Sequence, residues 1–198
     1  MSFYHFARSI VAGVMKPIFR FKVIGSENFP KEGGVLLCCN HISNLDPPAL
    51  GVAAPRPVSY MAKQELFEAP ILKTVLPKVH AFPVRRGKGD REALRTGLKA
   101  LKEGAVLGLF PEGTRSKDGQ IQKALAGAGF FALRSEAAIV PCAIIGPYKP
   151  FSRLKIVFGK PIDFESYRTE KISAEEATSI IMEEIQHLLD EQRGSRVG

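Results

Sequence analysis

The sequence predicts an α/β fold with a largely parallel central sheet flanked by helices, preceded by an N-terminal amphipathic helix. Three observations support this prediction. Short apolar or alternating runs recur along the chain and are typical of strands. Helix-like segments separate several of these runs, and strands that alternate with helices favour a parallel sheet. The chain has 198 residues, 45% of them hydrophobic, which suits one globular domain with a sizeable core.

The first predicted element is a helix over residues 3–16. On a helical wheel its apolar residues gather on one broad face, and Arg8 lies at the boundary of that face, where its stem can snorkel. Pro17 is a suitable stop. Nearby basic residues suit a helix that lies in a bilayer interface, but an ordinary helix packed on the domain's own core has the same pattern. The apolar face comprises Phe3, Phe6, Ala7, Ile10, Val11 and Val14.

The rest of the chain alternates between strand and helix patterns. Asp90 and Gly104 are the expected N-cap and C-terminal stop of one helix, and a capping box of Ser173 with Glu176 opens the last helix. The predicted strands cover residues 19–24, 34–39, 57–62, 80–84, 105–110, 138–145 and 154–159, and the later predicted helices cover residues 47–54, 90–104, 123–137 and 173–192.

The charge distribution indicates an anionic partner. The formal net charge is +8, and acidic residues are concentrated in residues 163–198, so the preceding part of the chain is strongly basic. Candidate partners are nucleic acid, a phosphorylated metabolite and an anionic lipid surface. Nucleic acid fits least well, because the sequence has no basic helix, no aromatic-rich RNA signature and no Trp.

The cysteines and the hydropathy pattern indicate a cytoplasmic protein. None of the three cysteines, Cys38, Cys39 and Cys142, has metal-ligand spacing to a His or another Cys. We expect them to be small buried side chains in the core of a protein that works in a reducing compartment. No apolar stretch is long enough to predict a spanning helix, and the N-terminus lacks the pattern of a signal peptide.

The segment "NHISNLD", residues 40–46, follows a predicted strand and holds a His and an Asp. Because Asp46 precedes a proline, the chain is expected to stay irregular up to Asp46, and Pro47 then begins a helix with Asp46 as its N-cap. A tight loop can fold His41 and Asp46 together, so that the carboxylate holds Nδ1–H and Nε2 can take a proton from an alcohol. Alternatively, Asp46 only caps the helix and His41 is a loop residue.

Three further segments, each at the end of a predicted strand, carry groups suited to phosphate. "FPEGTRS", residues 110–116, combines Thr114 and Arg115 with backbone N–H groups. "FPVRRGKG", residues 82–89, is strongly basic, and Lys63 follows another strand. Each of these features also fits an ordinary solvated loop or a surface lysine.

Together and in this order, the motifs resemble the four motif blocks of glycerolipid acyltransferases. The chain resembles the 1-acyl-sn-glycerol-3-phosphate acyltransferase (lysophosphatidate acyltransferase) family in its short bacterial form, over residues 35–145. The combination of H-x4-D with F-P-E-G-T-R-S is specific to that superfamily. The blocks are Asn40-His41 with Asp46, Phe82 to Gly87, Phe110 to Ser116, and Val140-Pro141.

The resemblance implies an enzyme that transfers a fatty acyl group from acyl-CoA or acyl carrier protein to the sn-2 hydroxyl of lysophosphatidate. In that family a histidine is the general base and an aspartate orients it, roles that fall on His41 and Asp46. The second and third blocks hold the acceptor's phosphate, which indicates Arg86 and Arg115, with Arg85 as the alternative to Arg86. The expected substrate-binding residues are Lys63, Arg85, Arg86, Glu112, Gly113, Thr114 and Arg115.

The resemblance also implies where the protein works and what it needs. It implies no metal or other cofactor, a lysophospholipid acceptor, an anionic membrane surface as partner and no nucleic acid. We expect a peripheral protein on the cytoplasmic face of the cell membrane, with residues 1–17 as the membrane-interface helix and residues 18–198 as the α/β acyltransferase domain. The alternatives are an acyltransferase acting on glycerol-3-phosphate or another lysophospholipid, and a non-catalytic peripheral membrane protein that binds phosphate.

Overall fold

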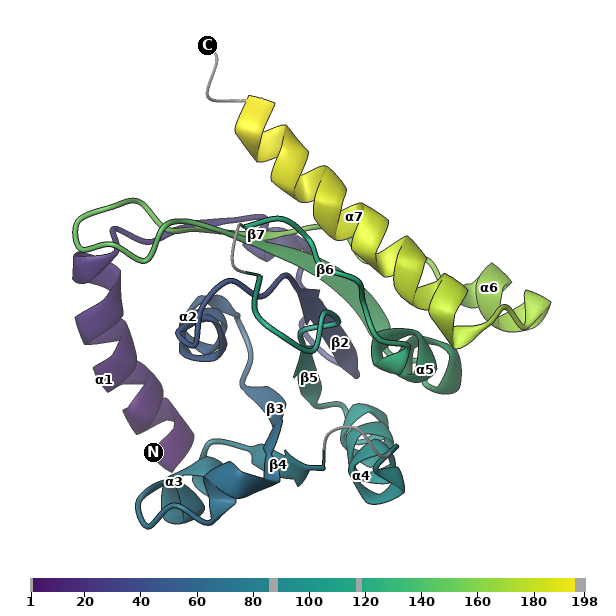
Figure 1. The fold of residues 1–198 in the computed structure, drawn as a ribbon, viewed down its shortest axis with the longest axis horizontal. Coiled ribbons are helices and arrows are strands. Elements are labelled where there is room, and N and C mark those ends of the chain that lie inside the picture. The colour runs from purple at the N-terminus through teal and green to yellow at the C-terminus, as the bar shows by residue number, and fades with distance from the viewer. Residues whose placement is uncertain (1, 86–88, 117–118, 195–198) are drawn as a thin grey trace.

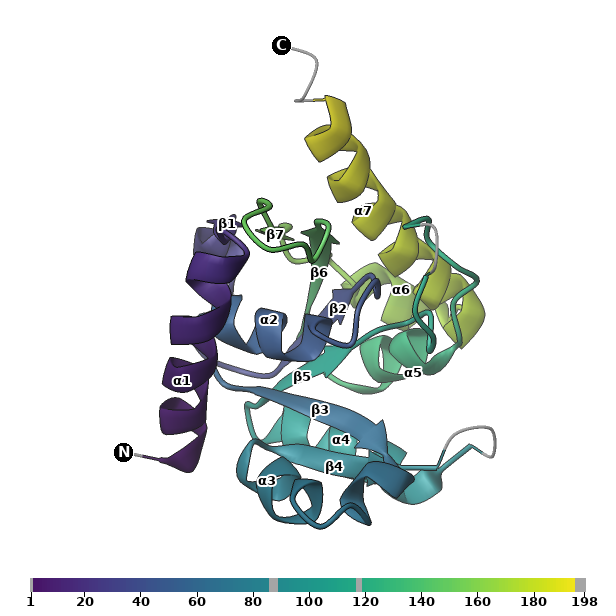
Figure 2. The ribbon, with the colours of Figure 1, turned by 60° about the vertical axis from the view of Figure 1, so that its left-hand side comes forward.

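The computed structural model describes residues 2–85, 89–116 and 119–194, and it shows a seven-stranded sheet with helices on both faces (Figures 1 and 2). All seven predicted strands are present, and the predicted α/β fold is confirmed. The strand order is β1-β7-β6-β2-β5-β3-β4. The strands are β1 (Lys22–Ile24), β2 (Val35–Cys39), β3 (Val58–Lys63), β4 (Ala81–Val84), β5 (Val106–Leu109), β6 (Ala138–Ile145) and β7 (Lys155–Phe158).

The sheet is largely parallel, as the sequence predicts. Every neighbouring pair is parallel except β6 and β7, so β6, β2, β5, β3 and β4 run in one direction and β7 and β1 run in the other. The carboxyl ends of the five co-directional strands therefore meet on one side of the sheet. Ligands collect at such strand ends in α/β proteins, and the predicted site residues follow four of the five ends.

The helices differ from the sequence prediction in number and length. Two helices, α3 and α6, were not predicted, because seven and six residues are too few to show a helical period. The helix predicted over residues 123–137 is shorter and begins at Gly127. The helices are α1 (Phe3–Ile18), α2 (Asp46–Ala53), α3 (Leu72–Lys78), α4 (Arg91–Lys102), α5 (Gly127–Arg134), α6 (Glu165–Glu170) and α7 (Ala174–Gly194), with short 3-10 turns at Ser26–Asn28 and Gln64–Phe67.

The predicted helix ends are confirmed where a polar side chain or a glycine defines them. The Asp90 carboxylate accepts hydrogen bonds from the N–H groups of Glu92 and Ala93 at the start of α4. Gly104 follows the end of α4 with a φ of 83°, a conformation that favours glycine. The capping box at the start of α7 is also present.

Strand β2 lies at the centre of the core. Its side chains alternate between two apolar clusters, with Val35, Leu37 and Cys39 on one face and Leu36 and Cys38 on the other. All five are fully buried. Such continuous apolar runs are typical of parallel strands covered on both faces. The described cysteines are free and buried, as expected.

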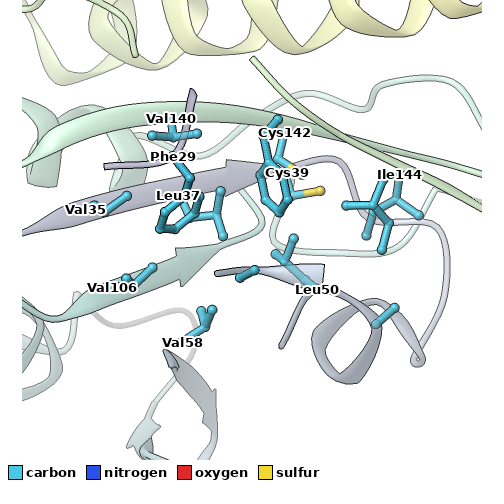
Figure 3. Packing of buried hydrophobic residues seen from close by; sticks show 14 of the residues in the cluster. Phe29, Val35, Leu37, Cys39, Leu50, Val58, Val106, Val140, Cys142 and Ile144 are labelled. Carbon is cyan, nitrogen blue, oxygen red and sulfur yellow. The ribbon is translucent and has the colours of Figure 1, made fainter. Parts of the chain in front are cut away.

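The two clusters define the layers around the sheet. The first cluster joins one face of the sheet to α1 and α2, and Figure 3 shows Leu50 of α2 packed toward Leu37 and Cys39 beside Phe29. The second cluster joins the opposite face to α4, α5 and α7. Helix α2 therefore lies between α1 and the sheet (Figure 2), and it directly follows the loop that carries His41.

Helix α1 is longer than predicted and is turned differently from what its apolar face suggests. It continues one residue past Pro17 to Ile18, because a proline in the last turn removes little helical hydrogen bonding. Its inward stripe contains Tyr4, Arg8, Val11 and Met15. The hydroxyl of Tyr4 accepts a hydrogen bond from Val58 N–H.

Arg8 does not snorkel outward, and that prediction is wrong. Its guanidinium donates to the carbonyls of Val52 and Ala54, at the end of α2, at 3.1 and 2.7 Å. Helix ends leave carbonyls without intrahelical partners, so Arg8 satisfies groups that would otherwise need water. As a result the predicted apolar face points largely to solvent, and its side chains Phe3, Phe6, Ile10 and Val14 are 40–56% exposed.

Candidate active site

The loop after β2 brings His41 and Asp46 together. Nδ1 of His41 lies 2.7 Å from Oδ2 of Asp46, within hydrogen-bond distance. The Asp46 side chain is fully buried, whereas the imidazole is 14% exposed. Within the described part of the chain Nε2 has no hydrogen-bond partner, so the carboxylate holds one ring nitrogen and leaves the other unbonded.

Asp46 does not cap α2 in the predicted manner. Helix α2 begins at Asp46 itself, and the carboxylate points back to the preceding loop, where Oδ2 accepts from the N–H groups of Ile42 and Ser43, both at 2.7 Å. The N–H groups at residues 42 and 43 form a compact turn around the carboxylate, and a turn of this size needs an acceptor at its centre. The aspartate therefore holds the loop and the imidazole at the same time.

A tyrosine completes the surroundings of this carboxylate. The hydroxyl of Tyr148, in the loop after β6, donates to Oδ1 of Asp46 at 2.7 Å. Burial, together with the charge of Asp46, raises the pKa of Tyr148, so the hydroxyl stays protonated and acts as a donor. The Tyr148 ring packs edge-on against Phe19 at 5.4 Å. The sequence does not reveal this residue as part of the site, because 102 positions separate it from Asp46 and no local pattern links them.

Two further side chains fix the backbone around His41. Asn40 is buried and both donates to and accepts from the backbone of Ile144, which joins the end of β2 to the end of β6. Glu112 accepts from His41 N–H through Oε1 and from Gln122 N–H through Oε2, each at 2.8 Å. The His41 loop is thus held by a neighbouring strand on one side and by the loop after β5 on the other.

Glu112 is placed to organise the loops. It is only 3% exposed, and both carboxylate oxygens accept backbone N–H groups. Burial raises the pKa of Glu112, and the N–H groups of Gln122 and His41 partly oppose this effect. The resemblance implies a substrate-binding role for Glu112, and the positions of its oxygens add a structural role that the motif alone does not reveal.

The imidazole lies against an aromatic wall. The ring of His41 stacks on Phe110 at 4.3 Å with 25° between the planes, and Phe110 is nearly parallel to Tyr60 at 6.4 Å. The hydroxyl of Tyr60 donates to the carbonyl of Pro47 at 2.9 Å, which fixes that ring to the start of α2. Stacking on Phe110 limits rotation of the ring about the bond that joins it to the His41 side chain, and so it supports the orientation set by Asp46.

The other predicted site residues lie at neighbouring strand ends. Thr114 and Arg115 are exposed in the loop after β5, next to Gly113, whose φ of 66° favours glycine. Lys63 ends β3 and Arg85 follows β4, and both are exposed. The strand order places them progressively farther from β2. Arg86 lies outside the described residues.

An oriented imidazole at the carboxyl ends of a parallel sheet is typical of an enzyme site. Residues 20–145 match the protein-family model described as Acyltransferase, and the chain belongs to this acyltransferase family. The resemblance inferred from the motifs is therefore confirmed.

Two bacterial relatives match most of the chain. The chain is 35% identical over 183 residues to the 1-acyl-sn-glycerol-3-phosphate acyltransferase of Bacillus subtilis (strain 168), covering 86% of this chain and 90% of the relative. A protein of the same name from Borreliella burgdorferi is 29% identical over 174 residues, covering 82% of this chain and 69% of that protein.

One solved structure shares the fold. It is the crystal structure of the 1-acyl-sn-glycerophosphate (LPA) acyltransferase, PlsC, from Thermotoga maritima, which matches with a TM-score of 0.70 at 22% identity. The match covers 95% of this chain and 83% of that chain. It supports the α/β architecture, including the N-terminal helix, independently of the sequence motifs.

Proposed function

We propose that the protein is a 1-acylglycerol-3-phosphate O-acyltransferase that moves a fatty acyl group from acyl-CoA or acyl carrier protein to the sn-2 hydroxyl of lysophosphatidate, giving phosphatidate. The names of the two bacterial relatives support this acceptor. The observation that carries the proposal is the 2.7 Å contact between His41 and the buried carboxylate of Asp46. A protein that only binds phosphate has no use for an imidazole oriented in this way, whereas acyl transfer to an alcohol needs a positioned base.

In the proposed reaction, Nε2 of His41 takes the proton of the sn-2 hydroxyl while the oxygen attacks the thioester carbonyl. The Asp46 carboxylate stabilises the imidazolium that forms. When the tetrahedral intermediate collapses, the carbon–sulfur bond breaks and the imidazolium returns its proton to the leaving thiolate. The acyl group is never bonded to the protein, so the proposed reaction needs no nucleophilic side chain. These proton and acyl transfers are also complete without a metal or other cofactor.

The acceptor's phosphate is assigned to the cationic groups at the strand ends. The glycerol hydroxyl and the phosphate are only a few bonds apart, so a hydroxyl at His41 places the phosphate nearest to the adjoining loop after β5. That loop carries Arg115, with Gly113 and Thr114 beside it. Lys63 is one strand farther away. Arg85 is farther still, because β4 lies three strand spacings, roughly 14 Å, from β2.

The same proposal includes a membrane partner, because both the acceptor and the product are lipids. Among the described residues no helix is long and apolar enough to cross a bilayer. The exposed stripe of Phe3, Phe6, Ile10 and Val14 on α1 is suited to lie in the interface of the cytoplasmic face. Since Tyr4 and Arg8 tie α1 to the core, single substitutions in the exposed stripe are a cleaner test than deletion of the helix.

The decisive experiment is the His41→Ala variant, assayed with a panel of acceptors and both donors. General bases contribute roughly 10²–10⁴-fold, so turnover should fall by that factor while binding of the acceptor survives. His187→Ala is the matched control, because His187 is 73% exposed on α7. Near-normal turnover by His41→Ala would refute the assignment of the base.

The acceptor panel distinguishes the proposed function from the alternative functions. Lysophosphatidate should be the best acceptor; a preference for glycerol-3-phosphate or another lysophospholipid would keep the chemistry and change the substrate. Absence of turnover on every acceptor, with lipid binding intact, would support the non-catalytic alternative.

A further inference from the structure

A strongly basic depression lies where the end of α1 meets the loop between β6 and β7. Four of its five lining residues are cations, and none is acidic. All four cations are exposed, and none takes part in an ion pair within the described part of the chain. The lining residues are Lys16, Arg20, Phe21, Lys22 and Arg153.

The neighbouring loop, residues 146–154, projects an aromatic side chain beside this depression. Phe151 is 76% exposed, although large aromatic side chains are usually well covered in a folded chain. The loop lies over the carboxyl end of α1 in both views (Figures 1 and 2). Lys149 and Arg153 flank Phe151 and are also exposed, so the aromatic tip is surrounded by positive charge.

Phe151 is held in this position by the backbone. Its N–H donates to the carbonyl of Ile18 at 2.6 Å, and Leu154 N–H donates to the carbonyl of Phe19 at 2.8 Å. Phe151 and Arg20 both have positive φ values, 64° and 41°, a conformation that is rare for residues other than glycine. Each of the two hydrogen-bonded segments thus contains one residue in an unfavourable conformation, and the Phe151 side chain remains exposed to solvent. Strain of this kind is often found at functional positions.

We propose that the Phe151 tip and the basic depression form a docking site for the headgroup layer of an anionic phospholipid bilayer. Clustered cations without acidic partners repel one another, and anionic headgroups relieve that repulsion. An aromatic ring beside them suits the boundary between headgroups and acyl chains. Four cations with no acidic partner in the described chain, beside an exposed aromatic ring, match the charged headgroups and the apolar boundary of a bilayer, which favours a lipid surface over a nucleic acid or an acidic protein as the occupant.

The docking site is fixed relative to the candidate active site. Tyr148 lies in the same loop, three residues before Phe151, and its hydroxyl is bonded to Asp46. A bilayer that contacts Phe151 therefore meets the protein at a set distance from His41. This part of the inference rests on the proposed function, since it concerns how a lipid acceptor would reach the imidazole from the membrane.

The test is co-sedimentation of the full chain with phosphatidylcholine vesicles, with and without phosphatidylglycerol. Arg20→Glu combined with Arg153→Glu should weaken binding to the anionic vesicles roughly tenfold or more, since each cation near an anionic surface contributes several-fold. Phe151→Ser should weaken binding to both kinds of vesicle, roughly tenfold, because a buried aromatic side chain is lost. Lys99→Glu with Lys102→Glu, on the exposed face of α4, is the charge-matched control.

Two further measurements make the outcome decisive. Thermal unfolding midpoints near that of the parent chain show that the variants fold, and turnover of a water-soluble short-chain acceptor should stay within about twofold.

Unchanged binding to anionic vesicles, or binding lost equally in the α4 control, would overturn the docking site. An equal loss of short-chain turnover would also overturn it, because the depression would then belong to the substrate site. If no acceptor is acylated but vesicle binding still depends on Arg20 and Arg153, the proposed function fails and the docking site stands.

Discussion

Replacing Tyr148 by Phe tests the view that Asp46 and His41 work as a hydrogen-bonded unit. The substitution keeps the ring that packs against Phe19 and removes only the hydroxyl that donates to Oδ1 of Asp46. That oxygen is buried, so it loses a partner that water cannot readily replace. An acceptor left in this way costs about 1–3 kcal/mol, and we expect the free energy of unfolding to fall by that amount.

The same change should lower turnover. The hydroxyl helps to fix the Asp46 carboxylate, which in turn holds Nδ1 of His41. A hydrogen bond to a charged group contributes about 1.5–3 kcal/mol, and about 1.4 kcal/mol corresponds to a factor of ten in rate. If about half of that energy serves to orient the imidazole, kcat/KM should fall by roughly 3–10-fold.

The assay is kcat/KM for the parent chain and Tyr148→Phe, with Tyr167→Phe on α6 as a control in the opposite cluster. The loss should not exceed about tenfold, because the 2.7 Å contact between His41 and Asp46 remains. A value for Tyr148→Phe equal to that of the parent chain, or an equal loss in Tyr167→Phe, would refute the reasoning.

Two further predictions concern side chains that hold backbone groups. Glu112→Gln should lower the free energy of unfolding by about 1–3 kcal/mol and turnover by at least about tenfold. Glutamine has one accepting oxygen, so it cannot accept from the N–H groups of both His41 and Gln122 as the carboxylate does. Glu103→Gln, on the surface, is the control and should change neither denaturant unfolding nor kinetics. Arg8→Ala should lower the unfolding midpoint, because the last carbonyls of α2 lose their donor, whereas Lys16→Ala should not. A midpoint for Arg8→Ala equal to that of the parent would show that water replaces the guanidinium without loss.

The strands could be predicted because their signal is local. The run from Val35 to Cys39 has no polar residue, and only a strand covered on both faces accommodates such a run at this length. Helix ends marked by Asp90 or Gly104 were predictable for the same reason, since a cap or a left-handed glycine acts within a few residues. Helices α3 and α6 were missed because less than two turns leaves no period to detect.

The orientation of α1 could not be predicted from its apolar pattern. Tyr4 and Arg8 face inward because partners exist there, namely Val58 N–H and the last carbonyls of α2, and these partners are remote in the sequence. A hydrogen bond to an unpaired backbone group can outweigh burial of one more apolar side chain. The inward stripe combines Val11 of the predicted apolar face with Arg8 at its boundary, so the wheel does not tell which side of the helix meets the protein.

The sequence alone determined the α/β class and the seven strands, and it indicated a short loop that can bring His41 to Asp46, because the proline after Asp46 begins a new helix. Only the tertiary structure decided which groups share the Asp46 carboxylate, why both oxygens of Glu112 are occupied, and where Phe151 projects. Those contacts join strand ends that neighbour each other only through the order β6-β2-β5. Hydrogen bonds act over about 3 Å, so partners a hundred residues apart become visible only when the sheet brings them together.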